Sequence, residues 1–136
     1  MRKALSLVLL LDLFLQILRW KFTTVKVVGH SMEPAIMPGS VVIVLRTRAM
    51  RVNDVVLVNE PDEGGGWITD RDRPMGYFVK RVKALAGQTV ETLKHPVPND
   101  HVYLVGDNSE RSLDSRHLGT CPLGAIHGRV VWPKID

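Results

Sequence analysis

The sequence predicts an all-β domain, a small barrel or folded sheet, preceded by one apolar helix. From residue 23 onward, β-branched and apolar residues gather in short runs that Gly, Pro, Asn or Asp interrupt. No stretch after Phe22 has the spacing of an amphipathic helix. The first 22 residues differ in composition from all that follow. We therefore expect two units, an N-terminal segment over 1–22 and a β-rich domain over 23–136.

The N-terminal segment is almost wholly apolar from Ala4 to Leu18, with basic residues on both sides. As a helix of about 1.5 Å per residue it covers roughly 22 Å, less than the ~30 Å hydrocarbon core of a bilayer. It spans only if the flanking basic side chains reach the surfaces and Trp20 lies at the interface. Asp12 is costly in mid-span unless it is protonated or faces a partner.

Three interpretations of this segment compete. We favour a short membrane anchor. A cleaved signal segment is the second, but the small residues of a cleavage site are missing. An amphipathic helix packed on the domain is the third. The flanking charge is nearly balanced, so it does not predict an orientation.

Seven short strands are expected in the domain, each rich in β-branched residues and bounded by turn-forming residues. They are Thr24–Val28, Ser40–Leu45, Asp54–Val58, Tyr77–Leu85, Thr89–Thr92, His101–Val105 and Gly128–Trp132. Between the third and the fourth, Glu60–Gly76 contains three consecutive glycines and predicts a long, solvated and mobile hairpin tip. Short strands with irregular links are typical of a barrel or folded sheet.

The composition fits one small domain and excludes several classes of protein. A chain of 136 residues with 45% hydrophobic content can form one modest core. The net charge is +4, but the basic residues are scattered and few aromatics lie among them, so nucleic-acid binding is not expected. The single Cys121 excludes an internal disulfide, and no Cys/His group has zinc-ligand spacing. We expect neither a metal nor another cofactor.

A serine and a lysine in unusual settings indicate hydrolytic chemistry. Ser31 lies in the Gly- and Pro-bounded turn Gly29–Pro34, and Lys80 lies in the apolar run Tyr77–Val82. A serine hydroxyl needs a base to take its proton. Lysine serves as that base only if burial keeps it neutral near the working pH, and Phe78 and its neighbours would supply the burial. Alone, such a serine is usually a turn residue, and such a lysine usually reaches for solvent.

A third segment, Gly106–Gly119, reads GDNSERSLDSRHLG. From Ser31 the chain reads SMEPAIMPGS, and from Lys80 it reads KRVKALAGQ. In this order the three segments resemble the type I signal peptidases, membrane-anchored Ser/Lys proteases that cut signal peptides from exported proteins. The resemblance runs from the N-terminal apolar segment to Trp132. The ending Gly128–Pro133 is similar to that of mitochondrial inner membrane peptidase subunits and of small bacterial maturation peptidases.

The resemblance implies that Ser31 is the nucleophile and Lys80 the general base. The Ser31 backbone N–H is then the first oxyanion donor. Gly29 stands where many family members carry a serine that supplies the second donor, so a backbone N–H or a water would complete the hole. Three further positions depart from the usual family pattern and are expected to tune turns rather than the dyad, namely Ala35, Ser40 and Gln88.

Supporting roles follow from the same resemblance. Ser112 matches the family position that hydrogen-bonds the lysine amine and orients it. Two ion pairs are implied beside the site, Arg81 with Asp107 and Asp114 with Arg116. Without the other two motifs, these Asp, Asn and Ser residues would be ordinary turn formers. His117 and His127 are alternative bases, because some relatives at the endoplasmic reticulum use histidine in place of the lysine.

The expected substrate is an extended segment bound by β-addition. The family accepts small residues, commonly Ala, at the first and third positions before the cut. The candidates for substrate contact are Met32, Pro34 and Ile36. Only 25 residues separate Lys80 from Gly106, which leaves no room for the large second β domain of some bacterial members.

The function expected from the sequence is a membrane-bound serine endopeptidase that cleaves signal or presequence peptides after small residues. Its expected partners are precursor proteins, the lipid bilayer and, as a further candidate, a second peptidase subunit. The family resemblance implies a single-pass protein with its catalytic domain on the non-cytoplasmic side, in the bacterial plasma membrane or facing the mitochondrial intermembrane space. Two alternatives stay open, a LexA-type self-cleaving Ser/Lys domain and a catalytically idle β subunit of a heteromeric peptidase.

Overall fold

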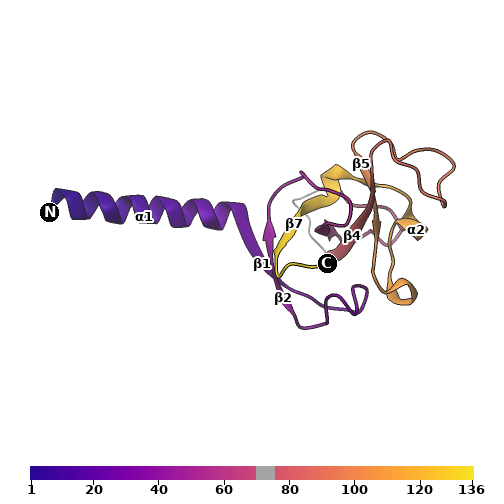
Figure 1. Ribbon diagram of the computed structural model, residues 1–136, viewed down its shortest axis with the longest axis horizontal. Helices are drawn as coiled ribbons and strands as arrows, with labels where there is room; N and C mark the ends of the chain where they lie inside the picture. Colours follow the sequence, from indigo (N-terminus) through magenta and orange to yellow (C-terminus); the bar gives the residue numbers. More distant parts are fainter. Residues whose placement is uncertain (70–75) are drawn as a thin grey trace.

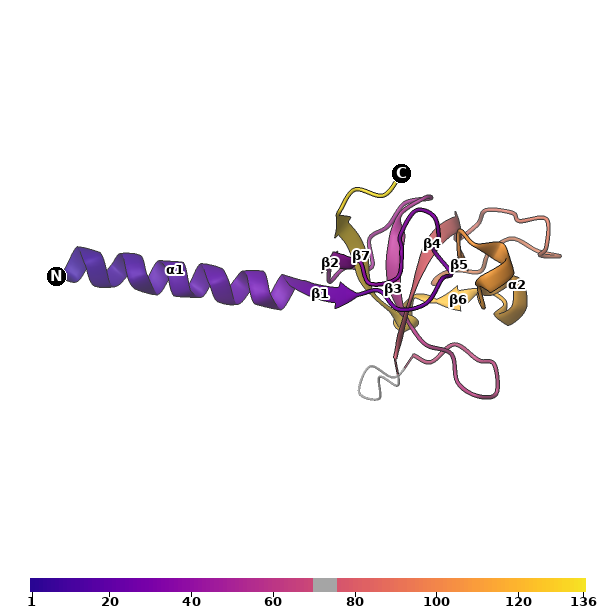
Figure 2. The same ribbon diagram turned by 90° about the horizontal axis from the view of Figure 1, so that it is seen from below.

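A computed structural model of the chain describes residues 1–69 and 76–136. One long helix, α1 (Arg2–Lys21), projects from a β-rich domain, and both ribbon views show it clear of that domain (Figures 1 and 2). No residue of α1 is buried, so the helix does not pack lengthwise on the domain. The predicted helix is confirmed over a longer range than the apolar run alone. Among the described residues, no helix combines the length and the apolar character needed to cross a membrane.

The domain is built on one antiparallel sheet of seven strands that curls into a half-barrel (Figure 1). The strands are β1 (Phe22–Lys26), β2 (Val41–Leu45), β3 (Val55–Asn59), β4 (Tyr77–Leu85), β5 (His101–Val105), β6 (Cys121–Pro122) and β7 (Ile126–Trp132). Their order in the sheet is β1-β2-β7-β3-β4-β5-β6. The prediction of an all-β domain is confirmed.

The predicted strands match the observed ones closely, with one error. The ranges of β4 and β5 agree at both ends, and the other strands begin or end within two residues of the predicted bounds. Thr89–Thr92 is not a strand, because the chain around it turns: Gly87 has φ +83° and Val97 donates its N–H back to the Gln88 carbonyl at 2.8 Å. The missed strand β6 has only two residues, too few to show a period.

The hairpin predicted at Glu60–Gly76 joins β3 to β4, with Asn59 opposite Tyr77. Its residues 70–75 lie outside the described part of the chain. Three short helical turns were not predicted, η1 (Ser109–Arg111), α2 (Ser115–Leu118) and η2 (Leu123–Ala125). The division of the chain at residue 22 stays a prediction.

Strand β3 is the centre of the core, because it is buried on both faces. Val55 and Leu57 belong to one cluster of buried side chains, and Val56 and Val58 belong to a second. Alternate residues of a strand face opposite sides of the sheet, so the unbroken apolar run of β3 separates the two clusters. Strand β4 lies directly beside β3 and so carries its own residues into the interior.

Candidate active site

The loop between β1 and β2 holds Ser31 in a turn pinned at both ends. At its base, Val27 donates its N–H to the Ser40 carbonyl at 2.8 Å. At its tip, Met32 and Ile36 are 1% and 3% exposed and pack into the core. These two side chains hold the turn against the domain and leave Ser31 partly exposed at its surface. Burial of the adjacent Met32 therefore fixes the position of Ser31 while the Ser31 side chain stays accessible.

The serine turn meets the third motif at Gly106. The N–H of Asn108 donates to the Ser31 carbonyl at 2.8 Å. A Cβ on Gly106 would lie 2.6 Å from the Ser31 carbonyl oxygen and 2.2 Å from Ser112 Oγ. Only a residue without a side chain allows Ser31 and Ser112 to approach each other this closely. Sequence reasoning assigned no role to this glycine or to Asn108.

Lys80 comes from β4 and is 2% exposed. Its Nζ donates a hydrogen bond to Ser112 Oγ at 3.0 Å and lies 4.9 Å from the centre of the Phe78 ring. Burial lowers the pKa of Lys80 to about 8 by disfavouring the charged amine. The negative charge of Asp114 opposes this shift, and the positive charge of Arg116 adds to it. The result is a lysine whose neutral form is accessible near neutral pH.

Asp114 is the buried hub behind Ser112. Its carboxylate accepts hydrogen bonds from Ser112 Oγ at 2.5 Å, from the Gly106 N–H at 2.8 Å, and from the Arg116 Nε and Nη2 at 2.9 and 2.6 Å. Burial alone would raise the pKa of Asp114, but the hydrogen bonds from Arg116, Ser112 and Gly106 outweigh it and lower the pKa to about 2. Asp114 is therefore ionised at any pH near neutrality.

The direction of these hydrogen bonds orients the lysine amine. A serine hydroxyl has one proton to donate, and that of Ser112 goes to the Asp114 carboxylate. Ser112 Oγ must then act as acceptor toward Lys80 Nζ. When Lys80 is neutral, an N–H faces Ser112 and the amine lone pair is directed elsewhere. Asp114 thus fixes Lys80 through Ser112 without touching the amine.

Arg81, the residue after Lys80, forms a second supporting cluster. Its Nε and Nη2 bind the two carboxylate oxygens of Asp107 at 2.8 Å each, and its Nη1 donates to the Asn53 carbonyl at 2.9 Å. Hydrogen bonds to Asp107 raise the pKa of Arg81 above its usual value. The pair ties β4 to the start of the third motif, next to the contact between Asn108 and Ser31.

The chain matches a family model described as signal peptidase, peptidase S26, over residues 1–95 and 91–134. The chain belongs to the signal peptidase family. It is 30% identical to mitochondrial inner membrane protease subunit 1 of Mus musculus over 123 residues, covering 79% of this chain and 68% of the relative. It is 31% identical to subunit 2 of the same organism over 124 residues, covering 79% and 66%. It is 32% identical to mitochondrial ATP-independent inner membrane protease subunit 1a of Arabidopsis thaliana over 133 residues, covering 85% and 73%.

The resemblance stated from the sequence motifs is thereby confirmed, and the protein is a serine protease of the signal peptidase type. The alternative of a catalytically idle subunit is not better supported by these matches. The structure brings together most of the residues that the family motifs singled out, in the two ion pairs and the bond from Lys80 to Ser112. Their roles in catalysis stay predictions.

The remaining candidates lie around this centre in different settings. Pro34 is exposed and can contact a substrate. Met32 and Ile36 are buried, so these two residues offer very little side-chain surface for the expected contact. Gly29 has φ +87°, a conformation that favours glycine over the serine of other family members. Among the described residues, no group of His, Cys, Asp or Glu is arranged to hold a metal ion.

The two alternative bases have partners of their own. His127 hydrogen-bonds through Nε2 to Asn59 Oδ1 and packs edge-on against Tyr77. His117 is largely exposed, with its Nδ1 3.9 Å from Asp114 Oδ1. Lys80 has the better setting for a base, since it is buried and bonded to the Ser112 that meets the Ser31 turn.

Activity should depend on pH through Lys80. Only the neutral amine accepts a proton, so kcat/KM for a soluble peptide is expected to rise with pH through about 8 and to level off above it. The free energy of unfolding should also increase as the pH rises from about 8 to 10.5, the ordinary pKa of lysine. Over that pH range the folded state binds fewer protons than the unfolded state. Both quantities are measured as pH profiles. A kcat/KM that is flat through this range contradicts Lys80 as the base.

Gly106→Ala should uncouple the serine turn from Ser112. The new Cβ would overlap both the Ser31 carbonyl oxygen and Ser112 Oγ, so one of the two segments must move. A displacement on the order of 1 Å at a catalytic group costs about 10²-fold in rate, and we expect at least that loss in kcat. Gly124→Ala is the matched control, because its Cβ would meet Thr69 at an ordinary 3.4 Å. Equal activity of the two variants would contradict the assigned contact.

Proposed function

We propose that this protein is a membrane-associated endopeptidase that cuts presequences from precursor proteins after small residues, with Ser31 as nucleophile and Lys80 as general base. The observation that carries the proposal is the buried Lys80, bonded to the serine that abuts the Ser31 turn at Gly106. Family membership gives the type of protease. The assignment of each residue to a step is ours.

The proposed reaction uses Lys80 twice. The neutral amine takes the Ser31 proton as Oγ attacks the scissile carbonyl carbon, and the Ser31 backbone N–H stabilises the oxyanion. The resulting ammonium gives its proton to the departing amine, which leaves an acyl-enzyme. Lys80 then takes a proton from water, whose oxygen attacks the ester carbonyl carbon. As the bond from that carbon to Ser31 Oγ breaks, the ammonium returns the proton to Oγ, which frees Ser31 and the new carboxyl end of the product. Ser112 and Asp114 keep the amine in place through both steps.

An open strand edge beside Lys80 supports binding of an extended substrate. Tyr77–Lys80 pairs with β3 on one side, whereas β5 pairs with β4 only from Arg81 onward. Within the described residues, the first half of β4 has therefore no strand partner on its second side. An extended peptide can add there by main-chain hydrogen bonds, which places its backbone next to the lysine.

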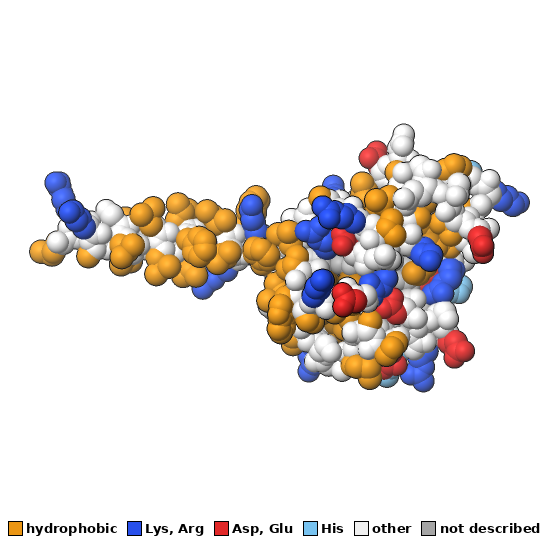
Figure 3. Space-filling view, in the orientation of Figure 1, with side chains coloured by type: hydrophobic (Ala, Val, Ile, Leu, Met, Phe, Trp, Pro, Cys, Tyr) orange, Lys and Arg blue, Asp and Glu red, His pale blue; other side chains and the backbone are white. Residues whose placement is uncertain are grey.

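The N-terminal helix supports membrane association. Its apolar side chains are exposed, and Figure 3 shows them along the helix and on the adjoining part of the domain. The relatives reported above are named as inner membrane proteases. We propose that α1 holds the domain at a membrane, on its non-cytoplasmic side. Asp12, bonded to Gln16 at 2.8 Å on the helix surface, would face a helix of a second subunit.

The test is cleavage of a presequence peptide with Ala at the first and third positions before the cut, using the full chain in detergent. Ser31→Ala is expected to lower kcat/KM by about 10³-fold or more, since no nucleophile remains. Ser109→Ala, an exposed serine in η1, is the matched control and should be as active as wild type. A Ser31→Ala variant that still cleaves would overturn the proposal. An inactive wild type that gains activity with a partner subunit would restrict it to the complex.

A further inference from the structure

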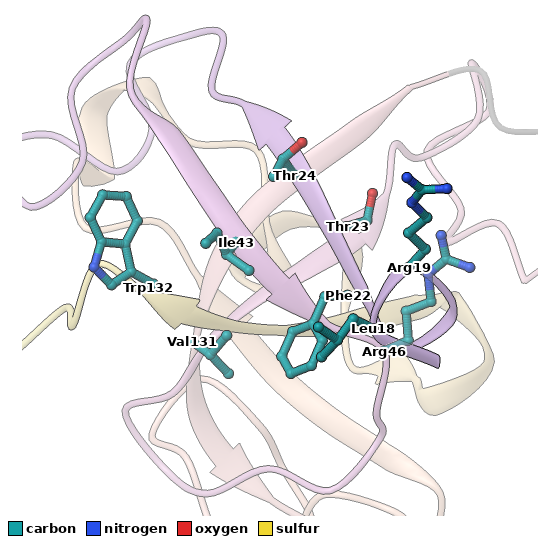
Figure 4. A pocket seen from close by; sticks show the side chains of 9 residues that line it. All are labelled: Leu18, Arg19, Phe22, Thr23, Thr24, Ile43, Arg46, Val131 and Trp132. Atoms are coloured by element: carbon teal, nitrogen blue, oxygen red, sulfur yellow. The ribbon is translucent and has the colours of Figure 1, made fainter. Parts of the chain in front are cut away.

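A groove lies where α1 meets the sheet, away from Ser31 and Lys80. It has a volume of about 690 Å³ and is lined by residues of α1, β1, β2, the segment after β2, and β7. Figure 4 shows its two unlike ends, with Arg19 and Arg46 together at one end and Trp132 at the other. Phe22, Ile43 and Val131 lie between them. The site chemistry described above uses none of these residues.

The cationic end has no counter-charge among the residues that the structure describes. Neither Arg19 nor Arg46 has a carboxylate within ion-pair distance in residues 1–69 and 76–136. The backbone bond from the Arg46 N–H to the Lys21 carbonyl, at 2.8 Å, keeps the segment after β2 against the end of the helix. Two neighbouring guanidinium groups with no carboxylate beside them in the described part of the chain favour a phosphate, which guanidinium binds with paired hydrogen bonds.

The apolar end is exposed to an unusual degree for its residue types. Trp132 is 59% exposed, and Trp20, which follows Arg19 in α1 but does not line the groove, is 71% exposed. Tryptophan is enriched where a protein surface meets lipid headgroups. The groove therefore joins a cationic end to an apolar floor, and it is continuous with a helix whose apolar side chains are all exposed.

We propose that this groove binds an anionic phospholipid, with the headgroup phosphate between Arg19 and Arg46 and the upper acyl chain against Phe22, Val131 and Trp132. The proposal rests on the membrane association proposed above and adds a lipid preference to it. Binding there would set the domain down on the membrane surface beside α1. It would fix the rotation of the domain about the helix, and so the direction in which the active site faces.

The experiment measures binding of the full chain to vesicles of phosphatidylcholine alone and of phosphatidylcholine mixed with phosphatidylglycerol. Wild type should prefer the mixed vesicles. Arg19→Gln and Arg46→Gln should each lower that preference about fivefold, as expected for a basic side chain near an anionic surface. Lys94→Gln is the matched control, since it removes the same charge from the loop before β5, at the end of the domain away from α1 (Figure 1). It should leave the preference unchanged.

Several outcomes would overturn the proposal. An equal loss in all three variants would mean that net charge, not a site, gives the preference. No loss in the two arginine variants would remove the site while leaving membrane association intact. Displacement by inorganic phosphate at matched ionic strength would identify a site for free phosphate. Cleavage of the soluble peptide in detergent should stay at the wild-type level in Arg46→Gln, which separates failure of this proposal from failure of the proposed function.

Discussion

Lys80→Met is expected to lower kcat/KM for the presequence peptide by about 10²–10⁴-fold, the range lost when a general base is removed. Methionine has a similar length and no amine, so it fills the buried space without taking the Ser31 proton. The apparent pKa near 8 in the activity profile should disappear with it. The measurement is kcat/KM against pH for wild type and variant.

The same substitution should not weaken the fold. Burial of the Lys80 amine is costly, as its lowered pKa indicates, and an apolar side chain of similar volume removes that cost. The Tm of Lys80→Met at neutral pH is expected to equal or exceed that of wild type. Lys83→Met on the same strand is the matched control, because Lys83 is exposed and its loss should leave activity near wild type. Full activity in Lys80→Met would contradict Lys80 as the general base and would leave His117 and His127 as the candidates.

Asp114→Asn should damage both the fold and the catalytic centre. The variant loses the charge that balances Arg116 and the acceptor that fixes the Ser112 hydroxyl. Breaking a buried charged network costs about 3 kcal/mol in the free energy of unfolding. Removing the negative charge should also lower the Lys80 pKa further, so the rise of activity with pH should shift to lower pH. Denaturant unfolding and the pH profile measure the two effects.

The stability loss in Asp114→Asn has its own pH dependence. The folded-state pKa of Asp114, about 2, lies below the ordinary value of 3.8. Its contribution to stability is therefore present above pH 4 and is lost as pH falls toward 2, so wild type and variant should converge there. Glu110→Gln, an exposed charge change in the same segment, is the control and should follow the wild-type curve. A constant difference between Asp114→Asn and wild type across this range would contradict the low pKa.

Local pattern was enough to predict the strands where it was long and uniform. Tyr77–Leu85 is a nine-residue run with apolar residues at both ends, and the structure gives β4 those bounds. Thr89–Thr92 is richer in β-branched residues, yet its backbone turns because Gly87 before it takes a left-handed conformation. A composition typical of strands does not reveal whether a neighbouring strand is present to pair with it.

The residues of the candidate site also fall into those that the sequence predicts and those that only the fold reveals. Ser31, Lys80 and Ser112 were readable because each belongs to a motif with a fixed spacing. The close approach at Gly106 and the bond from the Asn108 N–H could not be read, since both are contacts between segments far apart in the chain. The place of Met32 beside Ser31 makes it a candidate for substrate contact, but its burial is decided by the core of the domain.

The meeting of two loops at Gly106 also has a consequence for the alignment of the dyad. The Ser31 turn is anchored in one buried cluster by Met32, whereas Lys80 and Ser112 belong to a network held by Asp114. The two halves of the dyad are therefore carried by different segments of the chain, which meet at Gly106. A shift of either segment would move the nucleophile relative to its base, so the alignment of the dyad depends on this single approach between backbone and backbone.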